Sequence, residues 1–274
     1  MSTIKVTTLP NGLRVATDSM PHVETTSLGV WVGVGTRNER AEVNGVAHLV
    51  EHMVFKGTPS RTAFDISEQI EAVGGHMNAY TTREHTAYYA KVLKEDAALA
   101  LDVIGDMLQH SLLDEDELVR ERDVVLQEIG QAEDTPDDII FDWLQEAAYP
   151  NQPMGRTILG PADRVSRFGR ADLAGFVAEN YGPGQMIVAA AGDCGSGLES
   201  WHSMIATGAE RCTLTRATIE IDGIGSAQRL SFGDWPDLPV SLERKVASTV
   251  QPPDWADRPA PPPPPQNRAT AATA

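Results

Sequence analysis

Cysteine and long apolar runs are both scarce in this chain of 274 residues. Its two cysteines, Cys194 and Cys212, have no spacing typical of a metal or redox site. This excludes a disulfide framework, and reduced thiols are the default in a cytosol. No stretch approaches the roughly 20 apolar residues that a membrane helix needs. The first six residues lack the apolar core of a signal peptide and the arginine-rich character of a transit segment. We therefore expect a cytoplasmic protein without a membrane partner.

Basic residues are also few. The chain has 22 Lys and Arg against 39 Asp and Glu, a net charge of −17, which argues against nucleic acid and anionic membranes and favours cationic partners. The excess is concentrated in residues 114–138, which hold 11 acidic and 2 basic residues. Two interpretations stay open for this segment, a solubilising face or an attraction for basic peptides. With 41% hydrophobic residues the chain can bury a core, so a disordered chain is excluded.

The most informative stretch is His48-Leu49-Val50-Glu51-His52. Its apolar spacing predicts one short helix, with Asn44 as the N-cap and Gly57 after its end. On a helix, His48 and His52 lie one turn apart on one face, an arrangement that suits two zinc ligands. Glu51 leans toward the same face, where a general base beside a metal-bound water is needed. This order of residues is the inverzincin signature. The alternative is a pair of packed or surface histidines.

A catalytic zinc needs a third protein ligand and an open position. Residues 114–134 predict a helix with Asp114 as N-cap and Glu117 completing a capping box. Its apolar face includes Leu118, Val125 and Ile129. Glu121 and Glu128, two turns apart, fall on or beside that face. Carboxylates there are costly unless they are paired or bound to a metal. These two are therefore the candidates, while the other acidic residues of the helix are expected to be solvated.

With these residues the chain resembles the pitrilysin/insulinase (M16) family of zinc metallopeptidases, and within it bacterial members similar to the β subunit of mitochondrial processing peptidase. The family's spacing from the histidine motif to its glutamate ligand lands on Glu128, and a second family glutamate lands on Glu121. By this resemblance His48, His52 and Glu128 hold one Zn²⁺ per chain, Glu51 is the catalytic base, and Glu121 supports the ligands from behind.

The resemblance also implies a place for substrate. Residues Asn78, Ala79 and Tyr80 match the family's edge strand beside the zinc, where extended peptide adds as a further strand through backbone hydrogen bonds. The alternative is that Asn78 and Tyr80 are ordinary sheet residues. His76 and His85 are interpreted as structural and not as ligands.

Periodicity predicts strands at residues 4–9, 13–17, 25–36, 76–81, 85–93 and 185–191. It predicts further helices at 63–73, 95–110, 136–148 and 170–181. In the helix at 136–148 we expect the apolar side chains of Ile139, Ile140, Trp143 and Leu144 to pack. Together these elements indicate an α+β fold, a mostly antiparallel sheet with helices packed on it. The resemblance makes residues 1–193 a metallopeptidase N-terminal domain of the processing-peptidase type.

The resemblance ends near residue 193. Residues 194–250 are poorly patterned, and residues 251–274 form a Pro-rich tail, with 8 prolines among residues 252–265, that we expect to be disordered. Family members continue with a second homologous domain that cannot be found here. We therefore expect a truncated or frame-shifted product.

These observations predict a zinc-dependent endopeptidase that cleaves basic, extended, presequence-like peptides. The alternative is a truncated, weak or inactive subunit or binding module that needs a partner chain. A homodimer is a further possible assembly. The intact set of His48, Glu51, His52 and Glu128 favours the enzyme. A purely structural zinc is the weakest interpretation, because structural sites are closed and usually use cysteine.

Overall fold

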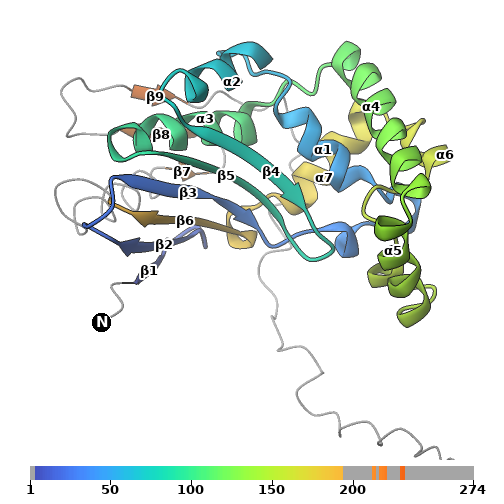
Figure 1. Cartoon of the computed structure of the whole chain (residues 1–274). Helices are drawn as coiled ribbons and strands as arrows, with labels where there is room; N and C mark the ends of the chain where they lie inside the picture. The colour runs from blue at the N-terminus through green and yellow to red at the C-terminus, as the bar shows by residue number, and fades with distance from the viewer. Residues whose placement is uncertain (1–3, 194–211, 214–215, 221–228, 232–274) are drawn as a thin grey trace, which may run out of the picture. The chain divides into compact units, whose positions relative to one another are not determined.

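The computed structural model describes residues 4–193, 212–213, 216–220 and 229–231 of the chain. Its main element is a six-stranded sheet in the order β1-β2-β6-β3-β5-β4 (Figure 1). The strands are β1 (Lys5–Thr8), β2 (Arg14–Ser19), β3 (Thr25–Val32), β4 (His76–Thr81), β5 (Thr86–Leu93) and β6 (Met186–Gly192).

All neighbouring strands of this sheet pair antiparallel except β2 and β6, which are parallel. Strand β6, the last of the six in sequence, lies between β2 and β3, with Val188 opposite both Val15 and Val30. The expectation of a mostly antiparallel sheet with helices packed on it is confirmed.

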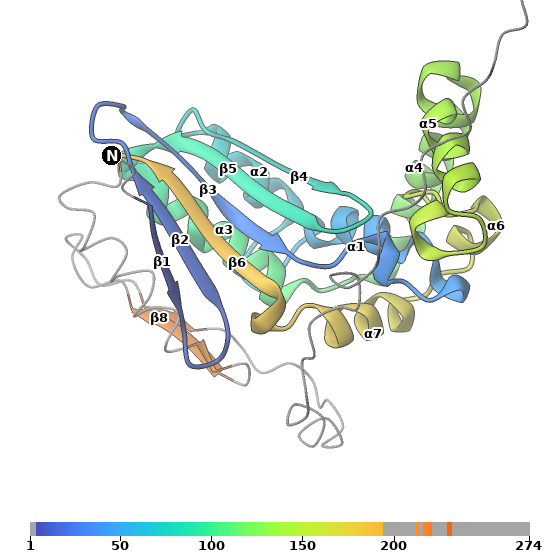
Figure 2. The same cartoon turned by 90° about the horizontal axis from the view of Figure 1, so that it is seen from below.

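Seven α-helices accompany the sheet in the described part of the chain. They are α1 (Val46–Val54), α2 (Ala63–Glu71), α3 (Ala97–His110), α4 (Glu115–Asp134), α5 (Pro136–Ala148), α6 (Ala162–Val165) and α7 (Arg170–Asn180). Helices α2 and α3 cover one face of the sheet, while α1 and α4–α7 gather beyond one end of it (Figure 2). Helix α1 packs against β4, α4 and α7, which places it between the sheet and the outer helices.

Alternation along the strands decides which face of the sheet is buried. In β3, Leu28, Val30 and Val32 point to the core, while Ser27 is exposed. Strand β5 repeats the pattern, with Tyr88 buried and Lys91 exposed. Because successive side chains of a strand point to opposite faces, this period of two places one apolar face under α2 and α3.

Helix α5 differs from expectation. Of the four side chains predicted to pack, Ile140, Trp143 and Leu144 are 57%, 62% and 60% exposed, and the neighbouring Phe141 is 66% exposed. Only Ile139 is partly buried. The prediction was wrong because the contacts of α5 with α4 and with the short 3₁₀ helix η4 (Pro153–Gly155) leave the other three side chains exposed. The rest of its apolar surface is uncovered in the described part of the molecule.

Three short strands, β7 (Cys212–Thr213), β8 (Arg216–Glu220) and β9 (Arg229–Ser231), form a separate antiparallel sheet. The remainder of the predicted segment 194–250, and the whole predicted tail 251–274, lie outside the described residues, so the predicted domain boundaries stay predictions. Among the helices that are described, none combines the length and apolar character required to cross a bilayer.

Candidate metal centre

Helix α1 places the histidine motif. Its apolar residues Val46, Ala47, Leu49, Val50 and Met53 are all fully buried. Burial of this side fixes the rotation of the helix, so the other side presents His48, Glu51 and His52 together. The two imidazole rings face each other edge to face, with their centroids 4.7 Å apart.

The start of α1 differs from the prediction that Asn44 is its N-cap. The N-cap position is occupied by Gly45, with φ of +102° and no side chain to offer. The side-chain amide of Asn44 instead donates to Glu39 Oε2 at 2.8 Å. The Glu39 carboxylate accepts the backbone N–H groups of Gly45 at 3.0 Å and Ala47 at 2.8 Å, so it does the capping from outside the helix.

Helix α4 supplies the carboxylates. Asp114 caps it as predicted, accepting the N–H groups of Asp116 and Glu117. The predicted capping box is absent, because the Glu117 carboxylate pairs with Arg120. The packed face consists of Leu118, Glu121, Val125 and Ile129. Since α4 packs against α1, the carboxylates of Glu121 and Glu128 meet the two histidines.

The distances fit a metal. Glu128 Oε2 lies 3.8 Å from His48 Nε2 and 3.6 Å from His52 Nε2. One ligand atom from each of the three residues falls within 4.8 Å of the others, and no other such group was found among the described residues. Bonds of about 2.1 Å in a tetrahedral zinc site separate neighbouring ligand atoms by about 3.4 Å. A small inward movement of these side chains would therefore complete a His₂Glu site with one position open.

Burial controls the charge of His48. Burial, with a smaller contribution from the neighbouring His52, lowers the pKa of this imidazole to about 3. The ring is therefore neutral near pH 7, as a metal ligand must be. Its Nδ1 is buried and has no hydrogen-bond partner in the described part of the chain. The other ring nitrogen, Nε2, faces Glu128.

Glu121 holds His52 from the other side. The Glu121 side chain is only 9% exposed; its Oε2 lies 3.1 Å from His52 Nδ1, and its Oε1 lies 2.6 Å from Lys56 Nζ. A carboxylate that accepts the Nδ1–H leaves the Nε2 lone pair free for a metal. Lys56 offsets the cost of burying the Glu121 charge.

Glu51 is held by a residue that the sequence did not indicate. The Thr81 hydroxyl, at the end of β4, donates to Glu51 Oε2 at 2.5 Å. Burial raises the pKa of Glu51, against the opposing effects of Thr81 and His52, and the charge of Glu128 adds to the rise. A carboxylate with a raised pKa beside a metal site suits a group that takes up and releases a proton. Thr81 directly follows the Asn-Ala-Tyr triplet, which was the available signal.

The triplet Asn78, Ala79 and Tyr80 lies on β4, one of the two edge strands of the six-stranded sheet. Asn78 and Tyr80 are exposed and Ala79 is partly buried. Between this edge and helices α1 and α2 lies a cavity of about 350 Å³. It is lined by Glu51, His52, Phe55, Lys56, Ser67, Ile70, Glu71, Met77, Asn78, Ala79 and Glu121. His76 and His85 are not in the three-residue group, and His85 Nδ1 lies 3.2 Å from the Thr82 hydroxyl.

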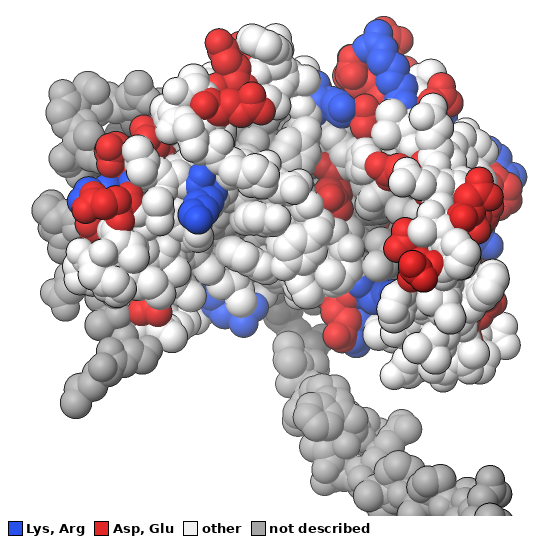
Figure 3. All heavy atoms as spheres, in the orientation of Figure 1, with Lys and Arg blue, Asp and Glu red and all other residues white. Residues whose placement is uncertain are grey.

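The surface charge is uneven. Acidic side chains gather over α4 and α5, at the right of Figure 3, with basic side chains scattered among them. This is the segment whose net charge stood out in the sequence. The acidic surface therefore includes α4, the helix that provides Glu121 and Glu128.

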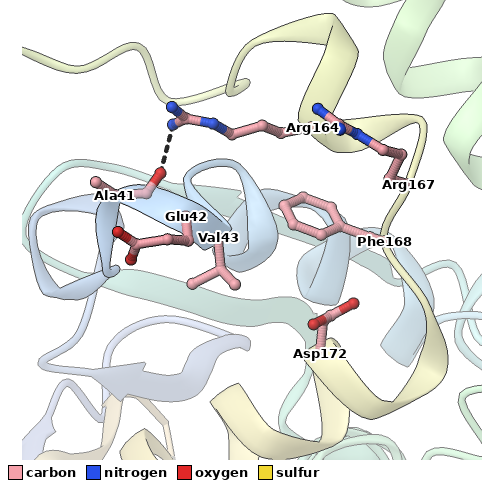
Figure 4. A pocket seen from close by; sticks show the side chains of 7 residues that line it. All are labelled: Ala41, Glu42, Val43, Arg164, Arg167, Phe168 and Asp172. Carbon is pink, nitrogen blue, oxygen red and sulfur yellow. Dashed lines mark hydrogen bonds between the residues drawn. The ribbon is translucent and has the colours of Figure 1, made fainter.

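A second cavity, of about 400 Å³, shares no residue with the metal centre. It is lined by Ala41, Glu42, Val43, Arg164, Arg167, Phe168 and Asp172 (Figure 4). Arg164 donates to the Ala41 carbonyl, Arg167 pairs with Asp163, and Asp172 accepts the Gly169 N–H at 2.9 Å. These charged groups are engaged in holding α6 and the start of α7, and the cavity offers no comparable set of convergent ligands.

Comparison with known proteins agrees with the geometry. A family model for insulinase (peptidase family M16) matches residues 14–162. A probable mitochondrial-processing peptidase subunit β of Arabidopsis thaliana is 50% identical over 188 residues, 69% of this chain and 35% of that protein. An uncharacterized zinc protease of Mycobacterium bovis is 48% identical over 187 residues, 68% of this chain and 43% of that protein.

Among solved structures, a protease from Helicobacter pylori has a TM-score of 0.71 and 26% identity, covering 77% of this chain and 50% of that chain. The chain thus spans half or less of the length of these three proteins. The fold, the histidine helix and the family match lead to one conclusion: the chain belongs to the M16 (insulinase) family of peptidases.

Proposed function

We propose that this chain is a zinc-dependent endopeptidase domain in which His48, His52 and Glu128 hold one zinc ion. The observation that carries the proposal is the convergence of three ligand atoms within 4.8 Å, beside a carboxylate, Glu51, that ligates nothing in this set. Zinc bound there would lower the pKa of a water molecule and polarise a peptide carbonyl. A structural zinc would have no need of the free carboxylate.

Three side chains around the ligands have further roles in the proposed reaction. Glu51 takes the proton of the attacking water and later passes it to the leaving amine. Thr81 keeps the Glu51 carboxylate directed at that position through its hydrogen bond. Glu121, held by Lys56, fixes the ring of His52 in the tautomer that leaves Nε2 free.

The substrate that suits this site is an extended peptide with basic residues. The open edge of β4 can pair with one more strand, which holds a backbone of any sequence. Glu71 lines the adjoining cavity, where Glu121 is already paired with Lys56, and further acidic side chains lie over α4 and α5 (Figure 3). Phe55, Ile70 and Met77 give the cavity an apolar part that can take one uncharged side chain.

A partner chain or a second copy is part of the proposal, because one of the relatives described above is named as a subunit. The competing function is an inactive or weakly active module that binds zinc and peptide but lacks the rest of the machinery. The two functions make different predictions for the isolated chain.

The test is hydrolysis of a short basic peptide by the zinc-loaded 274-residue chain, with Glu51→Gln as the matched variant. We expect cleavage that a chelator abolishes and that falls by about 10²–10⁴-fold in Glu51→Gln, the range for a lost general base. The variant should still bind one zinc per chain. Equal cleavage by the variant would contradict the role of Glu51. Zinc binding without cleavage by the wild type would favour the inactive module.

A further inference from the structure

We propose that Glu39, which lies outside α1 and touches none of the metal ligands, is the positioning residue that sets where His48 stands. The inference rests on the proposed zinc site. It starts from the first turn of α1, whose N–H groups have no partner within the helix and need one outside it. Gly45 brings no side chain to cap them, and Glu39 accepts two of them.

Glu39 is itself held in place. Its side chain is only 4% exposed, and its carboxylate also accepts from the Asn44 amide at 2.8 Å. The same Asn44 nitrogen donates to the Thr157 carbonyl at 3.1 Å, and Arg156 donates to the Glu39 carbonyl at 2.7 Å. Hydrogen bonds thus hold both the backbone and the carboxylate of Glu39, and they connect it to the loop at residues 156–157. A carboxylate held in this way can fix the position of the helix that it caps.

Residues 159 and 160 of the same loop also lie against the backbone at the start of α1. A Cβ added at Gly45 would meet the Leu159 carbonyl oxygen at 2.7 Å and the Gly160 Cα at 3.0 Å. The backbone at Gly45 is therefore confined between the Glu39 carboxylate and residues 159–160. Contacts on both sides therefore restrict the position of the first turn of α1.

His48 directly follows Ala47, whose N–H Glu39 accepts. A shift of the first turn therefore moves His48 directly. His52 stands one turn later and has its own support in Glu121. Loss of Glu39 would thus misplace one of three ligands, which weakens metal binding.

The experiment compares Glu39→Ala, Glu39→Gln and Thr62→Ala in the full chain. Gln keeps the size and one acceptor oxygen, and so provides a partial rescue. Thr62 caps α2, where it accepts the Asp65 N–H at 3.2 Å, and α2 carries no metal ligand. The measurements are zinc affinity by competition with a chromogenic chelator, the visible absorption of the cobalt-substituted protein, and the unfolding temperature of the metal-free protein.

We expect Glu39→Ala to lose zinc affinity by about 10–100-fold, the range for residues that orient ligands. Glu39→Gln should lie between Glu39→Ala and the wild type, and the cobalt spectrum should change in the same order. Thr62→Ala should lower the unfolding temperature with zinc affinity unchanged. If Glu39→Ala and Glu39→Gln keep zinc affinity within twofold of the wild type, Glu39 is only a structural cap and the inference is wrong.

Metal-free protein separates this inference from the proposed function. If the wild type bound no zinc, the proposed function would fail. Faster amide exchange at Gly45 and Ala47 in Glu39→Gln would then still support Glu39 as the group that holds the first turn. Unchanged exchange at both amides would overturn that role as well.

Discussion

Burial acts on the charges around α1 in opposite directions for acids and bases. It lowers the pKa of the His48 imidazole to about 3 and raises the pKa of Glu51 and of Glu39, the latter to about 7. In each case the low-polarity surroundings disfavour the charged form. The consequence is an imidazole with a free lone pair and a carboxylate prepared to accept a proton, close together on one helix.

The raised pKa of Glu39 predicts a pH dependence of stability. The Glu39 carboxyl has a pKa of about 7 in the folded protein and its ordinary pKa of 4.5 in the unfolded chain, so the folded state binds more protons between these values. The free energy of unfolding must therefore fall as pH rises from about 4.5 to about 7. We expect the stability of the metal-free wild type relative to Glu39→Gln to decrease over that range, as measured by urea unfolding. A relative stability that grows with pH would mean that the three donors outweigh burial.

Side chains that share one face of a helix could be predicted from the sequence. His48, Glu51 and His52 share a face of α1, and Glu121 and Glu128 a face of α4, by helical periodicity alone. Glu39 and Thr81 could not be found this way, because their contacts join elements that the chain order does not pair. Asn44 shows the limit of the N-cap preference of asparagine, since its side chain donates to Glu39 and does not cap the helix.

At the scale of the elements, Arg61 connects the loop before α2 to α3. Arg61, in the loop before α2, pairs with Asp102 and, at 2.7 Å, with Asp106, both on α3. The hydroxyls of Thr58 and Ser60 donate to the same Asp106 oxygen, each at 2.7 Å. The cluster is largely buried, so the charges depend on one another for compensation.

Removing Arg61 should therefore be costly. We expect Arg61→Met to lower the free energy of unfolding by about 3 kcal/mol, since two mostly buried carboxylates lose their cation. The matched control is Arg120→Met on α4, whose pair with Glu117 is exposed and should contribute less than about 1 kcal/mol. Urea unfolding of both variants at pH 7 measures the difference. Equal losses would mean that the Arg61 cluster is solvated in solution.

Elements were predictable where one strong pattern defined them. Helix α4 begins one residue after its predicted cap and ends at the predicted residue, because Asp114 and the apolar spacing agree. The parallel pairing of β2 with β6 was not predictable, since the strands are more than 160 residues apart in sequence. Helix α5 shows that periodicity identifies an apolar stripe but not what covers it.

At the scale of the whole molecule, the proposed ligands tie α1 to α4 across a long stretch of chain. Two come from one helix and the third from the other, and the segment between them includes α2, β4, β5 and α3. A bound metal would therefore act as a cross-link that only the folded chain can provide.

Zinc should accordingly stabilise the fold. At a free zinc concentration of 100 times Kd, we expect the free energy of unfolding to rise by about 2.7 kcal/mol. The unfolding temperature with zinc or with chelator measures the gain. Glu128→Gln should lose most of it, whereas Glu133→Gln, on the same helix and outside the site, should keep it. A gain that is the same in both variants would place the zinc elsewhere.

The uncovered surface of α5 also has an optical consequence. Trp143 is one of five tryptophans in the chain and is 62% exposed on that helix. An indole in water emits at long wavelength and is open to collisional quenchers, whereas one sealed by a neighbouring surface shifts to the blue and is protected. Trp143 is thus an intrinsic fluorescent probe of α5. Its emission should shift to the blue, and become protected from quenchers, when another surface covers this helix.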